Sequence, residues 1–168
     1  NIILDMIDSG LKGRGGAGFP TGLKWKFCRN EDTDTKYVIC NADEGEPGTF
    51  KDREILDRVP EKIFAGMTIC GFVIGAHEGY MYVRGEYNFM LKALDKKIEF
   101  FNKQLRDLKV DFQIFLRSGS GAYVCGEESA LFESMEGKRG EPRNKPPYPT
   151  VAGYNNKPTV INNVETLV

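Results

Sequence analysis

Histidine and tryptophan are scarce in this chain, and long apolar runs are missing from it. One His and one Trp occur among the 168 residues, which leaves little room for catalysis by histidine. No apolar segment approaches the roughly 18 residues that a membrane-spanning helix needs. No signal peptide opens the sequence either. The sequence therefore predicts no direct membrane insertion.

Cysteine is also infrequent, and its spacing is uninformative. The four cysteines form no C-x-x-C pair, so they predict neither a zinc site nor an iron–sulfur cluster, and we expect no metal in this chain. Reduced and mostly buried thiols are the favoured interpretation, and they fit the cytosol. For Cys125, an ordinary packed thiol is favoured over a reactive one.

No excess of one charge is present. The chain has 23 basic and 24 acidic residues with a net charge of −1, so nucleic acid is not an expected partner. The cationic segment Lys138–Lys145 lacks an aromatic stacking platform, which favours a solvated or phosphate-facing loop. A chain of this length forms one domain, residues 1–168. Because it lacks an initiating Met and stops at the predicted start of a helix, we expect an internal part of a longer polypeptide.

Short runs rich in aromatic and β-branched residues alternate with helical patterns. Three runs are predicted strands: Lys36–Cys40, Tyr80–Val83 and Phe112–Leu116. Pro60–Ala76 is apolar on most sides, and residues 91–105 repeat apolar groups at helical spacing after Asn88, a predicted cap. This alternation predicts an α/β fold with a parallel sheet flanked by helices.

The predicted topology has a consequence for function. Segments that follow parallel strands leave from one carboxyl edge, so residues 41–48, 85–87 and 117–126 are expected to be neighbours. A helix over Pro20–Cys28 would run antiparallel to the next strand, which places the preceding loop at that edge too. The sequence therefore predicts one crevice shared by distant segments.

The loop before that helix is dense in glycine. Gly13, Gly15 and Gly18 have the spacing G-x-G-x-x-G, but the preceding Ile2–Ser9 has helical rather than strand periodicity, so a standard dinucleotide fold is not predicted. Glycines let main-chain amides approach an anion. A flexible connector is the alternative, and the aromatic and basic residues through Phe27 favour phosphate or nucleotide binding.

Three further segments carry polar groups that suit a ligand. The carboxylates of Asp43, Glu44 and Glu46 follow the first strand, where they could accept from ribose or flavin groups or simply precede a helix. Residues 118–129 form a second glycine-rich loop, or a turn before a helix. The amides of residues 162–163 could cap a helix or bind a ligand, and their position alone does not choose.

Taken together, these segments resemble the FMN-binding, NADH-oxidising 51-kilodalton type of subunit of respiratory complex I, with its relatives in NAD-linked hydrogenases and formate dehydrogenases. The resemblance covers nearly the whole chain and depends on five motifs in order: Gly13–Gly22, Asn41–Glu44, Gly121–Glu128, Glu136–Gly140 and Asn162–Thr166. It implies a Rossmann-like FMN-binding domain.

The resemblance also implies roles for individual residues. The residues expected to bind the cofactor are Gly13, Arg14, Gly15, Gly16, Lys24, Asn41, Asp43, Glu44, Tyr123, Gly126, Glu127, Asn162, Asn163 and Thr166. Those expected to bind NADH are Phe19 and Phe27, around the adenine, with Lys24, Glu46 and Glu128 on the rest of the dinucleotide. No catalytic acid or base is expected.

The implied activity is hydride transfer from NADH to FMN, followed by electron delivery to a [4Fe-4S] cluster in a later part of the subunit and to iron–sulfur partner subunits. The location is then the cytoplasm, or the periphery of a membrane complex. Two alternatives stay open: an NAD-reducing diaphorase subunit of a hydrogenase or formate dehydrogenase, and a cofactor-free assembly module. The short passage Leu105–Asp111 lacks a glycine-containing insertion common in this family, which leaves the branch open.

Overall fold

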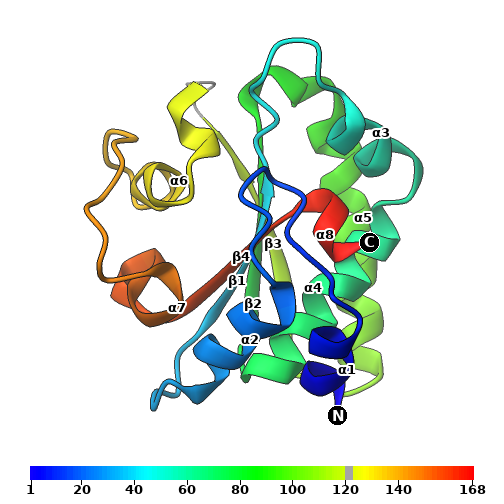
Figure 1. The fold of residues 1–168 in the computed structure, drawn as a ribbon. Helices are drawn as coiled ribbons and strands as arrows, with labels where there is room; N and C mark the ends of the chain where they lie inside the picture. The colour runs from blue at the N-terminus through cyan, green and yellow to red at the C-terminus, as the bar shows by residue number, and fades with distance from the viewer. Residues whose placement is uncertain (120–122) are drawn as a thin grey trace.

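A parallel sheet forms the centre of the computed structural model, which describes residues 1–119 and 123–168. Within these residues the sheet has four strands: β1 (Tyr37–Ala42), β2 (Glu78–Val83), β3 (Gln113–Ser118) and β4 (Thr159–Asn163). Their order is β3-β2-β1-β4, and every neighbouring pair is parallel (Figure 1). The predicted α/β class and parallel sheet are therefore confirmed.

Helices surround the sheet. The α-helices are α1 (Ile2–Asp8), α2 (Thr21–Asn30), α3 (Lys51–Arg58), α4 (Pro60–Ile74), α5 (Asn88–Asp107), α6 (Glu128–Met135), α7 (Pro149–Ala152) and α8 (Val164–Leu167). Short 3-10 helices are η1 (Gly85–Tyr87), η2 (Tyr123–Gly126) and η3 (Tyr154–Asn156). Among the described helices, none combines the length and the apolar character needed to cross a bilayer.

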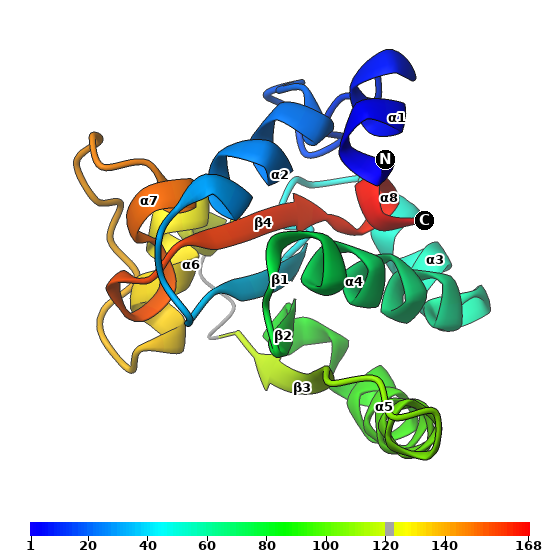
Figure 2. The same ribbon diagram turned by 90° about the horizontal axis from the view of Figure 1, so that it is seen from below.

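The two faces of the sheet have separate cores. Successive strand residues point to opposite faces, so Val38 and Cys40 of β1 pack with α4 and α5, whereas Ile39 packs with α6. Figures 1 and 2 show α4 and α5 on one side of the sheet and α6 on the other. Strands buried on both faces explain why their sequences are continuous apolar runs rather than alternating patterns.

The cysteines contribute to these cores. All four are buried, and these described residues form no disulfide. Burial raises the pKa of the Cys28 thiol to about 12, and it also raises the pKa values of Cys40 and Cys70. The expectation of packed thiols is confirmed.

Two local expectations are wrong. Asn88 does not cap α5: the 3-10 turn η1 leads directly into the helix, so Asn88 has helical backbone angles and Tyr87 precedes it as the N-cap residue. Asn41 does not end the first strand, because β1 continues to Ala42 and pairs there with its neighbour β2. Asn41 is therefore a strand residue, and it lies in register opposite Asn163 of β4.

Candidate functional site

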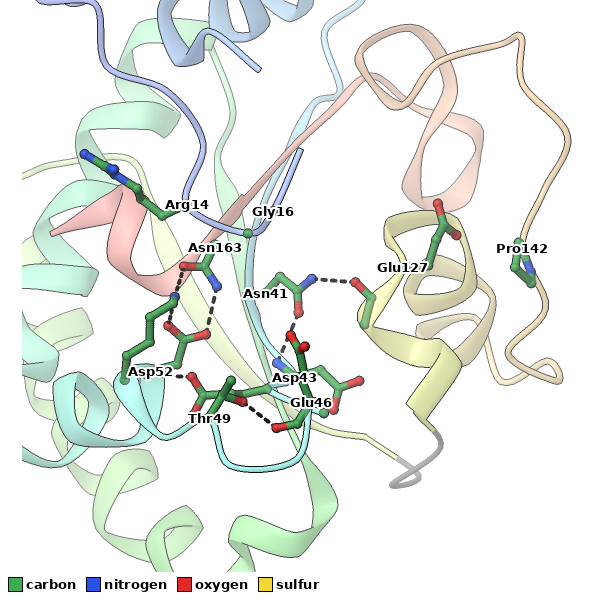
Figure 3. A pocket seen from close by; sticks show the side chains of 15 residues that line it. Arg14, Gly16, Asn41, Asp43, Glu46, Thr49, Asp52, Glu127, Pro142 and Asn163 are labelled. Atoms are coloured by element: carbon green, nitrogen blue, oxygen red, sulfur yellow. Dashed lines mark hydrogen bonds and ion pairs between the residues drawn. The ribbon is translucent and has the colours of Figure 1, made fainter. Parts of the chain in front are cut away.

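The pairing of β1 with β4 brings distant polar residues together at the carboxyl edge of the sheet. Asn41 lies opposite Asn163, and Cys40 lies opposite Asn162. The glycine loop passes over the same place, since the Arg14 amide donates to Thr166 Oγ1 at 2.9 Å. Figure 3 shows Gly16 of this loop near Asn163 and Asn41. The predicted convergence at one edge is therefore observed for the described segments.

A continuous cleft runs along this edge. One part has a volume of about 610 Å³, a second about 320 Å³ and a third about 600 Å³. Asn41, Gly126 and Asn163 line both the first and the second part, and Lys24 and Glu128 line both the second and the third. A long ligand, or two ligands in contact, would fit such a cleft.

The glycine loop leaves its backbone open to this cleft. At Gly16, φ is +120°, and a Cβ built there would meet no atom within 4 Å. A Cβ on Gly15 would lie 3.3 Å from Asn163 Cβ, so the loop crosses the strand end closely. The amide of Gly13 closes the loop by donating to the Phe19 carbonyl at 2.9 Å. Both the conformation and the open space suit main-chain contact with an anion.

Asn41 connects two walls of the cleft. Its Oδ1 accepts from the Asp43 amide at 3.1 Å, and its Nδ2 donates to the Gly126 carbonyl at 3.1 Å (Figure 3). Asn162 lies on the other side, and in the amide orientation that satisfies its neighbours its oxygen accepts from Trp25 Nε1 at 2.9 Å. The two amides therefore hold the site together as well as lining it.

Asp43 and Glu44 are adjacent, but their carboxylates differ in their hydrogen-bond partners. Asp43 is 9% exposed, and within the described part of the chain its Oδ2 has no hydrogen-bond partner. Burial raises the pKa of Asp43, and Arg84 opposes the shift. Glu44 also lines the cleft, but its carboxylate accepts from the Asp52 amide at 2.9 Å and from the Tyr87 hydroxyl at 3.4 Å. Asp43 is therefore the available acceptor of the pair.

A lysine bridges the two carboxylates on the opposite wall. Lys145 Nζ lies 3.1 Å from Glu127 Oε1 and 2.6 Å from Glu128 Oε1. Burial alone would raise the pKa of Glu127, but hydrogen bonds from Ser129 and Ala130 together with Lys145 lower it. Glu127 accepts both amides at the start of α6, so it is the N-cap of that helix.

The far end of the cleft is aromatic. The ring centroids of Phe19 and Phe27 are 6.5 Å apart, with planes tilted by 51°, and both rings are about half exposed. Lys24 Nζ donates to the Ile161 carbonyl at 2.9 Å, and burial lowers its pKa against the opposing effect of Glu128. Tyr148 lines the same end and is 61% exposed. The two rings contact each other, and a flat apolar group would pack against their exposed sides.

Nearly all of the predicted site residues that the structure describes line the cleft. Glu46 lies in the first part, beside Thr49, and Thr166 takes part through the Arg14 amide. The side chain of Tyr123 and residues 120–122 lie outside what the structure describes. Sequence reasoning did not single out several lining residues, among them Thr49, Lys51, Asp52, Pro142 and Tyr148. It had named Lys145 only within a cationic segment.

The comparison with known families decides the classification. Residues 6–168 match the Nuo51 FMN-binding domain family. The chain belongs to this family. The matched residues include the carboxyl ends of β1 and β4 and both glycine-rich segments.

Individual members of the Nuo51 FMN-binding domain family are similar over the whole chain. A subunit of the NADH-quinone oxidoreductase of Aquifex aeolicus is 53% identical over 98% of the chain and 40% of the relative. The alpha subunit of the NAD-reducing hydrogenase HoxS of Cupriavidus necator is 52% identical over 98% of the chain and 29% of the relative. The chain therefore spans well under half of the length of these relatives.

A solved structure agrees with the fold. A subunit in the crystal structure of an NAD+-reducing [NiFe]-hydrogenase in the H2-reduced state superposes with a TM-score of 0.94. It is 51% identical, and the match covers 99% of this chain and 29% of that one. The two folds thus agree over nearly the whole chain.

Proposed function

We propose that this domain binds FMN in the 610 Å³ part of the cleft and NADH in the aromatic part, which the 320 Å³ part connects to the first, and that its protein oxidises NADH. The observation that carries the proposal is the convergence of the glycine loop, the ends of β1 and β4 and the start of α6 on one cleft. Membership of the Nuo51 FMN-binding domain family supports the identity of the cofactor.

The residues present fit FMN. The open backbone at Gly16 suits a phosphate, and Asn163 lies beside it. A side chain at Gly16 would enter the space that the ligand needs. Asp43 Oδ2, which lacks a partner among the described residues, would accept from a ring N–H of the isoalloxazine. Asn41 and Gly126 form the floor between these two regions.

The aromatic end fits NADH. Phe19 and Phe27 would pack against the adenine, with Tyr148 at the rim. Lys24 and Lys145 are the cations of this region, and either would face the pyrophosphate. Glu46 and Glu128 would accept from ribose hydroxyls.

Bound FMN would supply hydride acceptance and release of electrons one at a time. The chain itself would bind and orient both partners face to face, with no side chain acting as acid or base. We further infer that electrons leave to a [4Fe-4S] cluster in another part of the polypeptide and to iron–sulfur subunits of a multi-subunit oxidoreductase. The protein would then work in the cytoplasm, or at the periphery of a membrane complex.

A second candidate function is NAD reduction in a diaphorase subunit. The relatives include an NAD-reducing hydrogenase subunit at 52% identity and an NADH-quinone oxidoreductase subunit at 53%. These near-equal identities do not separate the two directions, and the partner subunits set the direction of flux. A cofactor-free assembly module is disfavoured, because the open conformation of Gly16 and the buried acceptor of Asp43 are retained.

The proposal is tested by the absorption spectrum of the intact purified protein. We expect a flavin band that bleaches when NADH is added under anaerobic conditions. A preparation that carries no flavin and takes up none from solution would overturn the cofactor assignment. Retained flavin that NADH does not bleach would overturn the donor.

Glu128 provides a sharper test of the dinucleotide region. Glu128→Gln removes a carboxylate that would repel a ribose 2′-phosphate, and it also releases Lys145 from an ion pair of 2.6 Å. We expect the ratio of kcat/KM for NADPH to that for NADH to rise at least about tenfold, since like charges in contact are costly. The matched control is Glu141→Gln, an exposed glutamate that lines none of the three parts of the cleft. An unchanged ratio would remove Glu128 from this role.

A further inference from the structure

A buried carboxylate lies directly behind Asn163. Asp52 is 3% exposed, and its Oδ2 accepts from Asn163 Nδ2 at 2.8 Å. Lys51 Nζ lies 2.7 Å from Asp52 Oδ1 and 2.9 Å from Asn163 Oδ1. Figure 3 shows this closed set of contacts at the wall of the cleft. None of the sequence motifs singled out Lys51 or Asp52 as part of the site.

These contacts fix the orientation of the Asn163 amide. Its oxygen accepts from Lys51 Nζ and from the Glu165 amide at 3.1 Å, and its nitrogen faces the Asp52 carboxylate. In the reverse orientation the nitrogen would face two donors and the oxygen would face an anion. Both contacts would be repulsive, so only one orientation is stable.

Asp52 is itself held rigidly. It lies in the first turn of α3, and its amide donates to Glu44 Oε2 at 2.9 Å. A carboxylate is favoured at that end of a helix, and Lys51 balances its charge. The pair therefore forms a fixed support at the wall of the cleft rather than a mobile surface contact.

We propose that Asp52 and Lys51 are positioning residues that present Asn163 to the cofactor as a hydrogen-bond donor only. An amide nitrogen carries two hydrogens, and Asp52 takes one of them. The other is directed to an acceptor oxygen of the ribityl phosphate arm of FMN. This inference rests on the proposed function, because it requires FMN in the cleft that Asn163 lines.

The test is a double-mutant cycle in the native full-length protein with its flavin removed. Asp52→Asn keeps the size of the side chain but replaces one carboxylate oxygen with an NH2 group and removes the negative charge, so Asn163 Nδ2 no longer faces an anion and the support is weakened. We expect FMN binding, followed by quenching of flavin fluorescence, to weaken about tenfold. In an Asn163→Ala background the same change should cost little, since the group it orients is already gone.

Riboflavin identifies the acceptor oxygen within the ligand. A loss of affinity seen with FMN but not with riboflavin places the contact on the phosphate. An equal loss with both places it on the ribityl hydroxyls. A loss with neither ligand overturns the proposal.

Two further variants make the result decisive. Asp57→Asn changes an exposed aspartate of the same helix and should leave FMN affinity unchanged. Lys51→Met removes the contact of Lys51 with Asn163 Oδ1. Because the Lys51 side chain is partly exposed, this variant should still show a weaker affinity for FMN even where Asp52→Asn lowers the melting temperature. Equal losses in the native and Asn163→Ala backgrounds would show a purely structural role. Wild-type protein that binds no FMN at all would instead refute the proposed function.

Discussion

Gly16 combines a left-handed backbone with open space in front of it. We predict that Gly16→Val abolishes flavin retention, weakening FMN binding by about a hundredfold, because a branched side chain would both strain the backbone and occupy the anion position. The measurement is the flavin content of the purified variant, followed by titration with FMN. Retained flavin absorbance would contradict the role of the loop.

A variant at a second glycine distinguishes the effect of backbone strain from the effect of blocking the ligand site. Gly75 also has a positive φ, +81°, but it ends α4 away from the cleft. Gly75→Ala should therefore lower the melting temperature and leave FMN affinity unchanged. Equal losses of flavin in both variants would attribute the Gly16 effect to stability alone.

Asp43 gives the flavin-free protein a pH-dependent stability. Burial raises the pKa of the folded carboxyl above that of the unfolded chain, so the cost of Asp43 develops as pH rises through that window and is full above it. We predict that Asp43→Asn raises the free energy of unfolding by about 1 kcal/mol at neutral pH. Below the unfolded pKa the carboxyl is protonated in both states, and the two proteins should be equally stable.

Thermal denaturation from about pH 3 to about pH 8, which begins below the ordinary pKa of an aspartate, checks this prediction. The comparison uses flavin-free samples, because the same carboxylate would gain a partner when FMN binds. A variant less stable than the parent at neutral pH would show that Asp43 has a stabilising partner.

The sequence predicted which residues line the cleft better than what their side chains do there. The glycines and asparagines were recognised as site residues because few other residues leave the main-chain amides accessible or can both donate and accept hydrogen bonds. The engagement of Glu44 with α3 and of Asn162 with Trp25 was not predicted, since both contacts join segments separated in the chain. Tyr148 was overlooked because a single exposed aromatic carries no periodic signal.

At the level of elements, three of the four described strands were predicted, and neither β4 nor the strand order was. β1, β2 and β3 are rich in β-branched and aromatic residues, which local preference reveals. The place of β4 beside β1 depends on packing across the sheet, which composition does not encode. The prediction that Asn88 caps α5 was wrong because the turn before this helix, η1, is itself helical.

One arginine joins the segment between α6 and α7, residues 136–148, to its neighbours. Arg143 donates to Glu133, to Glu136 Oε1 at 2.7 Å and to the Gly153 carbonyl at 2.8 Å, and it lies over the Phe132 ring. We predict that Arg143→Ala lowers the free energy of unfolding by about 2 kcal/mol, since hydrogen bonds to charged groups are lost.

Chemical denaturation measures the loss, and Arg139→Ala is the matched control. Arg139 is 89% exposed and its ion pair is with a single exposed glutamate, so its removal should change stability little. Because Arg143 also holds the segment that carries Lys145, NADH affinity should fall together with stability. Equal stability of the two variants would show that the segment is held by other contacts.

For the whole molecule, the convergence of separate segments predicts a cooperative response to FMN. At a concentration one hundred times the dissociation constant, binding should stabilise the fold by about 2.7 kcal/mol. Hydrogen exchange should slow together in residues 13–18, 41–48 and 162–166. The distal part of α5, which does not line the cleft, serves as the internal control.

Protection confined to one of these segments would contradict a shared cleft. Uniform protection across the chain, α5 included, would reflect global stabilisation without local contact. The pattern therefore separates specific binding from a general effect.

The order of the strands also constrains biosynthesis. β4 is the last strand of the described sheet, yet it pairs with β1, the first, and contributes Asn163 to the cleft wall. While a ribosome is still translating the preceding residues, this wall of the binding surface does not exist. Binding of the proposed coenzyme at this wall would thus be a late event, because β4 must first leave the ribosome and pair with β1.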